Sequence, residues 1–294
     1  MKLNYEVIEI ATVDNVAIIT MKNPPVNQLS DILVKDLSNA IQSCFENQSV
    51  DALIVTGSGN NFIAGADVTE LRLVKSKPDF LPNVMENHSF LNGIEGGPKP
   101  VIAAINGVCL GGGLEFAMAC HYRIAVKGVR IGLVEVQVGL LPGGGGTQRM
   151  PRLVGLSAAL PMITEGQAIR SEDAENIGLI DQVVASDDLL SEALKTASFF
   201  LSNQLNLNKK RTSNKTDRLP DLDEKTSMIA SARNRTKKKA KGYLAPFKAI
   251  DAFEMGLSHD FQADLAVEAD LFCDCLVSDT AKNLIDIFLN TRSA

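Results

Sequence analysis

The sequence contains no tryptophan, and aromatic residues make up only 5% of its 294 residues. Proteins that hold single-stranded nucleic acid stack its bases on aromatic side chains, so extended base stacking is not expected here. The net charge of −6 is also unfavourable for binding a polyanion. Both features predict a protein that does not bind nucleic acid.

Long hydrophobic runs are missing as well. No stretch reaches the roughly 18 consecutive apolar residues that a membrane-spanning helix needs. The N-terminal segment alternates apolar and polar residues and lacks the continuous apolar region of a signal peptide. The C-terminal residues 290–294 do not form a peroxisomal targeting signal. We therefore predict a cytoplasmic protein, in a cytosol of the bacterial type, without a membrane span.

Cysteine pairs with the spacing of disulfide frameworks or zinc sites are also absent. The five cysteines are scattered, except for Cys273 and Cys275, which lie too close together to serve as a ligand pair. Only three histidines accompany them, and His121 is expected to be structural. We predict reduced, buried thiols in a reducing compartment, and no metal site.

The apolar pattern that is present predicts a mixed α/β chain. Alternating residues at 5–10 and 16–21 predict two strands joined by a hairpin turn, and Ser30 and Asp67 are each expected to cap a helix that follows. Two strands followed by a helix is an order that recurs along the chain. This order predicts an α/β core of stacked ββα units followed by an α-helical extension.

One segment near the end of this core differs in composition. Residues 205–241 carry twelve Lys or Arg against four Asp or Glu, a net charge of +8 in a chain of net charge −6. A solvated connector and a basic rim for an acidic ligand or partner both explain this charge. We accordingly divide the chain into a core, residues 1–204, and a basic connector with helical extension, residues 205–294.

Three consecutive glycines lie between a predicted apolar strand, 101–105, and a predicted helix, 112–119. Glycine lets a backbone N–H approach a ligand closely, and the start of a helix adds partial positive charge, so Gly111–Gly113 could hold an oxyanion. Tight packing of the strand against the helix explains the glycines equally well. A dinucleotide-binding fingerprint is excluded, because its third glycine would fall on Phe116.

Two acidic residues that follow these glycines, Glu115 and Glu135, stand among apolar neighbours. An unpartnered buried carboxylate is unfavourable, so such acids need a structural or a chemical reason. Glu115 lies in the first turn of the predicted helix, where the helix dipole alone could account for it. Glu135 could belong to a buried ion pair. Taken together, the two acids favour paired acid–base chemistry beside a bound carbonyl group.

Several short motifs follow one another in a specific order. They are Asn23–Leu29, Ile63–Asp67, Lys99–Gly107, Gly111–Glu115, Gly132–Pro142 and Gly146–Arg149. On these motifs the chain resembles the crotonase (enoyl-CoA hydratase/isomerase) superfamily over about residues 5–200. The later segments 219–221, 245–250 and 283–288 resemble the hydratase half of multifunctional fatty-acid β-oxidation enzymes. The resemblance implies a crotonase spiral of repeated ββα units with a C-terminal α-helical extension.

The resemblance also implies a role for each site residue. The backbone N–H groups of Ala66 and Gly112 would form an oxyanion hole for the thioester carbonyl of an acyl-CoA. Glu115 would deprotonate the water that attacks C3, and Glu135 would deliver a proton to C2. Contacts with the substrate are expected from Val26, Gln28, Ala64, Gly65, Ala66, Asp67, Gly111, Gly112, Pro142 and Gly143.

The expected activity is that of a 2-enoyl-CoA hydratase of fatty-acid β-oxidation, with a Δ3–Δ2 isomerase activity for which Glu135 would shuttle the proton. Coenzyme A enters only as part of the substrate. An isomerase or other enolate-forming enzyme without hydration remains an alternative, as does a non-catalytic acyl-CoA-binding scaffold in a β-oxidation complex. For the oligomeric state, the resemblance is compatible with a trimer, a hexamer or a monomer. Val134 departs from the family, which usually has proline before the second glutamate.

Overall fold

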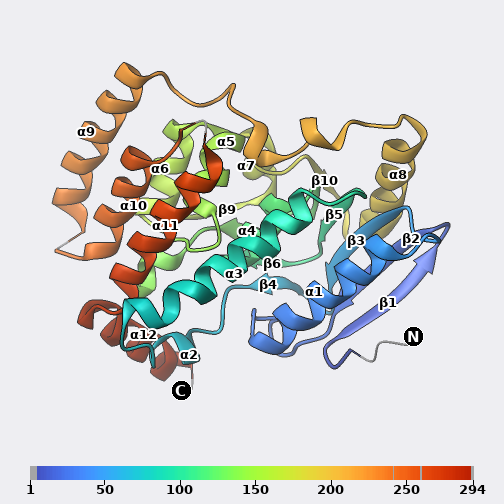
Figure 1. Cartoon of the computed structure of the whole chain (residues 1–294), viewed down its shortest axis with the longest axis horizontal. Coiled ribbons are helices and arrows are strands. Elements are labelled where there is room, and N and C mark those ends of the chain that lie inside the picture. The colour runs from blue at the N-terminus through green and yellow to red at the C-terminus, as the bar shows by residue number, and fades with distance from the viewer. Residues whose placement is uncertain (1–4, 241, 259, 293–294) are drawn as a thin grey trace. The chain divides into compact units, whose positions relative to one another are not determined.

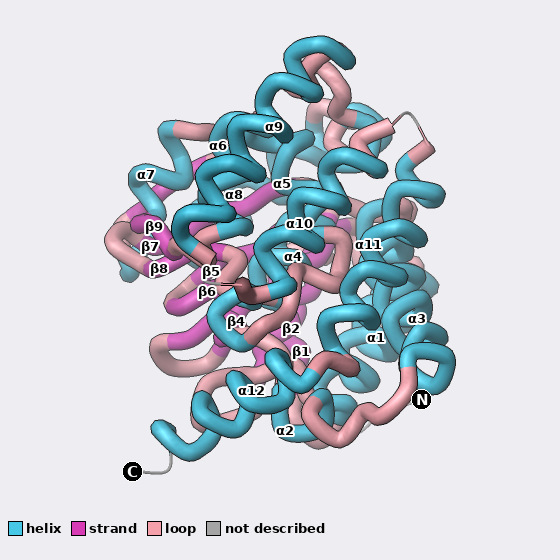
Figure 2. The backbone as a smooth tube through the Cα atoms, turned by 90° about the vertical axis from the view of Figure 1, so that its left-hand side faces the viewer, coloured by secondary structure: helices cyan, strands magenta, loops and turns pink. Residues whose placement is uncertain are grey.

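The computed structural model describes residues 5–240, 242–258 and 260–292 of an α/β chain (Figure 1). Strands and helices alternate through the first two thirds of the described chain, and helices follow (Figure 2). The chain forms two compact, discontinuous units. Unit 1 comprises Met1–Ala66, Phe90–Ile131 and Ile169–Asn214, and unit 2 comprises Asp67–Ser89, Gly132–Ala168 and Lys215–Ala294.

The predicted N-terminal hairpin is present. Strands β1 (Ile8–Val13) and β2 (Val16–Met21) pair antiparallel around Asp14 and Asn15, which have φ of 47° and 62°. Two consecutive left-handed residues make the tight turn whose twist suits a hairpin, and Asp and Asn tolerate this conformation better than most residues. The first strand begins at Ile8 rather than at the predicted residue 5.

Unit 1 contains a six-stranded sheet in the order β1-β2-β3-β5-β7-β10. Every pair from β2 onward is parallel. Its inner strands are continuous apolar runs, as expected of parallel strands covered on both faces. Helix α8 (Leu189–Ser202) covers β3, β5 and β7, and α1 (Asp31–Glu46) packs on the hairpin. The four strands of this sheet beyond β1 and β2 are β3 (Ala52–Gly57), β5 (Val101–Ile105), β7 (Tyr122–Val126) and β10 (Gln182–Val184).

A second sheet of four short strands was not predicted from the sequence. Its order is β4-β6-β8-β9, and its strands have only three or four residues each, too few to produce a recognisable alternation. The strands alternate between the two sheets along the chain, since β3, β5 and β7 join the larger sheet and β4, β6 and β8 the smaller. The short strands are β4 (Asn61–Ala64), β6 (Val108–Leu110), β8 (Arg130–Gly132) and β9 (Ala168–Arg170).

This alternation is what the predicted ββα repeat looks like in three dimensions. Each strand pair is followed by helical structure: β1 and β2 by α1, β3 and β4 by α2 (Val68–Leu71), and β5 and β6 by α4 (Gly112–Ala119). The pair β7 and β8 leads into a 3-10 helix, η1 (Glu135–Val138), and then α5 (Gly146–Val154). Ser30 and Asp67 cap α1 and α2 through their side chains, as predicted.

Unit 2 is mainly helical, and the predicted C-terminal helices are present. Helix α10 packs on α5, α6, α9 and α11, and α11 also packs on α5. Among the described residues, no helix combines the length and apolar character needed to cross a bilayer. The remaining helices among the described residues are α3 (Lys77–Glu95), α6 (Leu156–Thr164), α7 (Ser171–Asn176), η2 (Ser186–Asp188), η3 (Leu207–Lys209), η4 (Thr212–Asn214), α9 (Leu222–Lys239), α10 (Leu244–Met255), α11 (Phe261–Leu276) and α12 (Asp279–Arg292).

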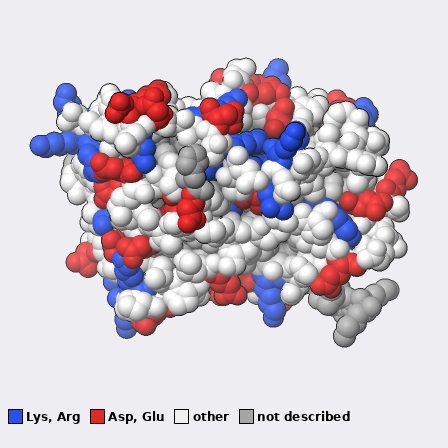
Figure 3. All heavy atoms as spheres, turned by 45° about the horizontal axis from the view of Figure 1, so that its top comes forward, with Lys and Arg blue, Asp and Glu red and all other residues white. Residues whose placement is uncertain are grey.

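Many cations of the basic connector serve contacts inside the chain. Lys210 lies over the rings of Tyr122 and Phe200, 5.9 and 5.5 Å from their centroids. Arg233 of α9 pairs with Asp251 and Glu254 of α10. On the face drawn in Figure 3, both basic and acidic side chains reach the surface. These contacts favour a connector held by its own charges, while the predicted division at residues 204/205 stays a prediction.

Candidate active site

The two residues predicted to form an oxyanion hole follow adjacent parallel strands of unit 1. Strands β4 and β6 pair with Ala64 opposite Leu110. Ala66 and Gly112 each lie two residues beyond that pair, so their backbones leave the same edge of the sheet. Neighbouring strands lie about 4.8 Å apart, which suits two N–H groups that share one acceptor.

Leu29 connects these two positions. Its backbone forms a parallel bridge with Ala66, and its N–H donates to the carbonyl of Gly65 at 2.9 Å. Gly65 has φ of +98°, a conformation that a residue with a side chain rarely adopts. A Cβ atom built on Gly112 would lie 2.8 Å from Cδ1 of Leu29. Ala66 and Gly112 therefore border the same leucine.

The carboxylate of Glu115 lies beside Gly112. A Cβ on Gly112 would be 3.9 Å from Oε2 of Glu115, whose residue is only 4% exposed. Glu115 occupies the first turn of α4, and its N–H donates to the carbonyl of Gly111 at 3.1 Å. The buried acid predicted to act as base is thus adjacent to one predicted oxyanion donor.

Helix α4 packs directly on the short sheet because its second residue is glycine. A Cβ on Gly113 would lie 2.4 Å from the carbonyl oxygen of Ile63 in β4. The packing explanation for the triple glycine therefore holds at Gly113. At Gly112 the neighbours of such a Cβ are instead a leucine methyl and the Glu115 carboxylate, so packing on the sheet does not explain this glycine.

The far end of α4 is anchored by two residues that the sequence did not single out. Arg123 is fully buried and donates to the carbonyls of Cys120 and Leu179 at 2.9 and 3.1 Å, while it pairs with Asp181 at 2.6 Å. Thr212 donates to the carbonyl of Met118 at 2.8 Å. These bonds satisfy carbonyls that a helix end leaves open. The sequence did offer one sign of this role, because Arg123 is a charged residue within an otherwise apolar strand.

The segment Asn23–Leu29, which carries the expected substrate contacts Val26 and Gln28, lies along β4. The carbonyl of Val26 accepts from the N–H of Ala64 at 3.2 Å, and Asn23 donates to the carbonyl of Gln28 at 2.9 Å. Asn27 is buried with φ of 51°, and its amide bonds the backbones of Asn23 and Asn61. Unit 1 thereby gathers eight of the predicted site residues: Val26, Gln28, Ala64, Gly65, Ala66, Gly111, Gly112 and Glu115.

The other predicted residues belong to unit 2. Glu135 begins η1, and both of its carboxylate oxygens are buried. Gly139 closes η1 with φ of 78°, and the N–H of Leu140 returns to the carbonyl of Glu135 at 3.1 Å. Pro142 and Gly143 follow in the glycine-rich turn before α5. Asp67 caps α2 through its side chain, which accepts from the N–H of Thr69.

Val134 has backbone angles that proline cannot reproduce. Its φ is −112°, whereas the proline ring requires about −65 ± 15°. Valine, unlike proline, can adopt this conformation directly before Glu135.

The histidine nearest to Glu115 in sequence has a structural environment. Nδ1 of His121 accepts from the N–H of Val101 at 3.1 Å, at the start of β5. Burial lowers the pKa of His121 to about 4, opposed by the charge of Glu95. A neutral imidazole that accepts a backbone hydrogen bond fits the structural role predicted for it.

All five cysteines are free and buried. Burial raises the pKa of Cys273 to about 11 and that of Cys275 to about 12, which makes both poor nucleophiles near neutral pH. Within the described ranges, no group of three or more His, Cys, Asp or Glu is arranged to hold a metal ion.

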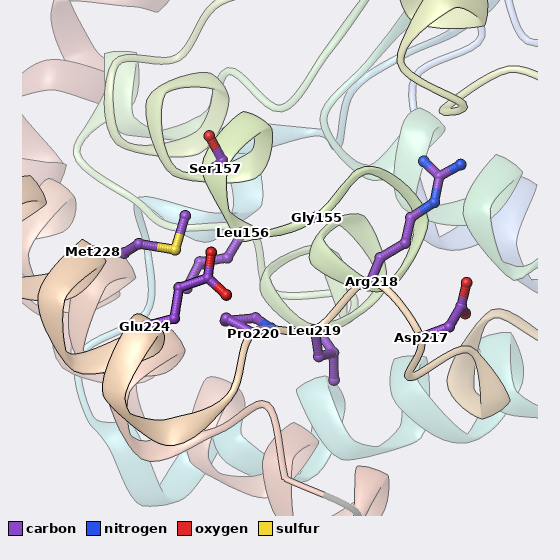
Figure 4. A pocket seen from close by; sticks show the side chains of 9 residues that line it. All are labelled: Gly155, Leu156, Ser157, Asp217, Arg218, Leu219, Pro220, Glu224 and Met228. Carbon is purple, nitrogen blue, oxygen red and sulfur yellow. The ribbon is translucent and has the colours of Figure 1, made fainter.

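A surface hollow of about 240 Å³ in unit 2 lies away from the predicted residues, none of which lines it (Figure 4). It is bordered by the first turn of α6 and by the segment leading into α9. Its lining mixes Asp217 and Glu224 with Arg218, so no single charge dominates. The hollow is formed by Gly155, Leu156, Ser157, Asp217, Arg218, Leu219, Pro220, Glu224 and Met228.

Comparison with known proteins identifies close relatives over nearly the whole chain. A glyoxysomal fatty acid beta-oxidation multifunctional protein of Cucumis sativus is 38% identical over 289 residues, 98% of this chain and 39% of that protein. A fatty acid oxidation complex subunit alpha of Shewanella frigidimarina is 36% identical over 291 residues, 95% of this chain and 40% of that protein. The chain thus spans about two fifths of the length of these relatives.

A solved structure and a family model agree with them. The enoyl-CoA hydratase of Bacillus anthracis is 29% identical and superposes with a TM-score of 0.63, covering 82% of this chain and 100% of that one. This match confirms the predicted crotonase fold. The family model described as enoyl-CoA hydratase/isomerase matches residues 11–244. The chain therefore belongs to the enoyl-CoA hydratase/isomerase family.

Proposed function

We propose that the chain is a 2-enoyl-CoA hydratase of fatty-acid β-oxidation, in which Glu115 activates water and Glu135 protonates C2. The observation that carries this proposal is the position of the Glu115 carboxylate beside Gly112, 3.9 Å from a Cβ built there. A general base must lie close to the carbon that it helps to attack, and the carbonyl activating that carbon would be held at Gly112.

The proposed chemistry begins with polarisation of the thioester carbonyl. The N–H groups of Ala66 and Gly112 donate to its oxygen and stabilise the negative charge that develops there. Gly112 is the first residue of α4, so the helix dipole adds to this stabilisation. Withdrawal of electrons toward the carbonyl leaves C3 of the conjugated double bond electron-poor.

Water is then added across the double bond. Glu115 takes one proton from the water while the water oxygen bonds to C3. The electron pair of the double bond then passes into an enolate. Glu135 gives its proton to C2 as the enolate collapses to the thioester. The product is a 3-hydroxyacyl-CoA, and proton exchange with solvent water returns both carboxyls to their starting states.

The second candidate is isomerisation of a 3-enoyl-CoA, favoured by the family's double description as hydratase/isomerase. In that reaction one base removes a proton from C2 and returns it at C4, so no water is consumed. Glu135 would carry this proton, because its proposed place is at C2. The oxyanion donors Ala66 and Gly112 would serve the same enolate.

The test is the turnover of crotonyl-CoA and longer enoyl-CoAs, followed by loss of the absorbance of the conjugated thioester. Glu115→Ala and Glu135→Ala should each lower kcat by at least about a hundredfold, with the thermal unfolding midpoint of each variant as a control for folding. Near-normal hydration by either variant would refute the mechanism.

The same variants separate the alternatives. An isomerase that does not hydrate would convert 3-enoyl-CoA in the wild type, and this activity would persist in Glu115→Ala but not in Glu135→Ala. A non-catalytic scaffold would bind acyl-CoA and turn over neither substrate at any chain length. The expected profile for our proposal is hydration that requires both glutamates.

Compartment and assembly are part of the proposal as well. Five buried, free thiols support a reducing compartment, and we propose a cytoplasm of the bacterial type. The relatives named above include both a glyoxysomal and a bacterial protein. The choice between monomer, trimer and hexamer can be tested by light scattering on the purified chain. Participation in a β-oxidation complex needs co-purification with its partner proteins.

A further inference from the structure

The glycine-rich turn of unit 2 is held by a buried acid from a distant helix. Glu268 of α11 is 0% exposed, and its carboxylate accepts from the N–H groups of Gly145 and Thr147 at 2.5 and 2.9 Å. The hydroxyl of Thr147 donates to the same carboxylate at 2.5 Å. Three donors around the first turn of α5 therefore converge on one side chain.

His88 of α3 links this acid to the preceding residue of the turn. Its Nε2 lies 2.8 Å from the carbonyl oxygen of Gly143 and 3.3 Å from Oε1 of Glu268. A carbonyl oxygen can only accept, so Nε2 carries the hydrogen and is shared between the two oxygens. The peptide bond is planar, so fixing the Gly143 carbonyl fixes the direction of the next N–H as well.

The hydrogen bonds to the Glu268 carboxylate offset the free-energy cost of removing it from water. A buried carboxylate without donors is strongly unfavourable, whereas here it receives four hydrogen bonds at the positive end of α5. Unlike an ordinary N-cap, the acid comes from another helix, 121 residues further along the chain than Thr147. It therefore ties the turn to α11.

The other end of the segment that leads to this turn is also fixed. Gln137 of η1 donates to the carbonyl of Gly166 at 2.8 Å. A Cβ on Gly139 would lie 2.8 Å from Cα of Ala281, so α12 packs against the end of η1. Residues 135–145 thus run between two anchored ends, and they carry Glu135, Pro142 and Gly143.

We propose that His88 and Glu268 are positioning residues of the active site, which set the carbonyl of Gly143 and the turn after it. The inference rests on the proposed function, because Pro142, Gly143 and Glu135 are the residues of that segment that are expected to face the substrate. Neither His88 nor Glu268 touches the substrate in this proposal. They act through the turn, whose misplacement would lower the rate of the chemical step.

Glu268→Gln tests the acid, with Asp264→Asn as the matched control. Asp264 lies on the same helix and is 2% exposed. Its carboxylate bonds Arg152 of α5 at 2.9 Å and Ser258, not the turn at 143–145. Glutamine keeps the shape of Glu268 but turns an NH2 group toward donors. We expect Glu268→Gln to lower kcat at least about tenfold with little change in KM, and Asp264→Asn to change neither by more than about twofold.

His88 offers a rescue test. His88→Leu removes the donor, whereas His88→Gln can place an N–H near the same position. We expect kcat to fall in His88→Leu and to recover largely in His88→Gln. Equal loss in both would mean that volume, rather than the bond to Gly143, is what matters, and would overturn the role of His88.

Amide hydrogen exchange gives a readout that does not depend on turnover. Peptides covering 143–147 should exchange faster in Glu268→Gln than in wild type or Asp264→Asn. If the wild type is active and Glu268→Gln is equally active, the positioning role is overturned while the proposed function stands. The same holds if Asp264→Asn loses as much kcat as Glu268→Gln. A wild type that hydrates no enoyl-CoA would instead overturn the proposed function, and this positioning role with it.

Discussion

Protonation of His121 should destabilise the folded chain below neutral pH. Its Nδ1 accepts from the N–H of Val101, and a protonated ring would turn a second donor toward that group. Burial is the main reason that the pKa of His121 is lowered to about 4; Arg211 and Arg123 act in the same direction and Glu95 opposes them. The bond holds the first residue of β5, a central strand of the larger sheet.

The size of the effect follows from linkage. A pKa that falls from 6.5 in the unfolded chain to about 4 in the folded one is a difference of roughly 2.5 units at 1.36 kcal/mol each, or about 3 kcal/mol in total. Because the folded state favours the neutral ring, this stability is fully present above pH 6.5. It is lost as the pH falls toward 4, and about 2 kcal/mol should be gone by pH 5.

Urea unfolding of wild type and His121→Asn at pH 8 and pH 5 measures this directly. The amide oxygen of asparagine can accept from Val101 but does not titrate, so the pH dependence of all other groups cancels in the comparison. The variant should lose about 2 kcal/mol less than wild type between the two pH values, whatever its stability at pH 8. Equal losses in both proteins, or an NMR titration of the His121 ring near pH 6.5, would show the reasoning to be wrong.

Three further predictions follow from the structure. Gly112→Ala keeps its backbone N–H, but the added Cβ would lie between the Leu29 methyl and the Glu115 carboxylate, so kcat should fall about tenfold while stability changes little, because the leucine side chain can move. Gly113→Ala should instead lose about 1–3 kcal/mol of stability against the backbone of Ile63; thermal unfolding and hydration assays distinguish the two variants. Val134→Pro should destabilise the chain by more than about 1 kcal/mol in urea, since φ of −112° does not suit proline, and an unchanged midpoint would contradict this. The five thiols should resist iodoacetamide at pH 8 until the chain is unfolded, and rapid labelling of Cys273 or Cys275 in the native state would argue against their raised pKa values.

The elements that could be predicted are those whose signal is local. The hairpin turn at Asp14-Asn15, the caps at Ser30 and Asp67 and the buried strands of the larger sheet each depend on residues close together in sequence. The short strands β4 and β6 could not be predicted, because three or four residues define no period and their pairing joins segments more than 40 residues apart.

The residues of the candidate site likewise differ in whether their contacts are short-range or long-range in sequence. Glu115 and Gly112 are neighbours on one helix turn, so their proximity was visible in the sequence. The anchors of the site depend on long-range contacts: Arg123 reaches Asp181, and His88 reaches Glu268, 180 residues away. A single sequence holds no signal for such pairs, and the resemblance to a family drew attention to the reacting residues rather than to those that hold them.

The bond from Thr147 to Glu268 also sets an order of events during synthesis. A growing chain that has completed the glycine-rich turn must add 121 residues before the side chain that receives its N–H groups exists. Until then α5 begins with open donors, in water or on a chaperone. The turn therefore cannot gain its full set of hydrogen bonds until α11 has been made, and fragments ending at residue 204 would carry it in an unfinished state.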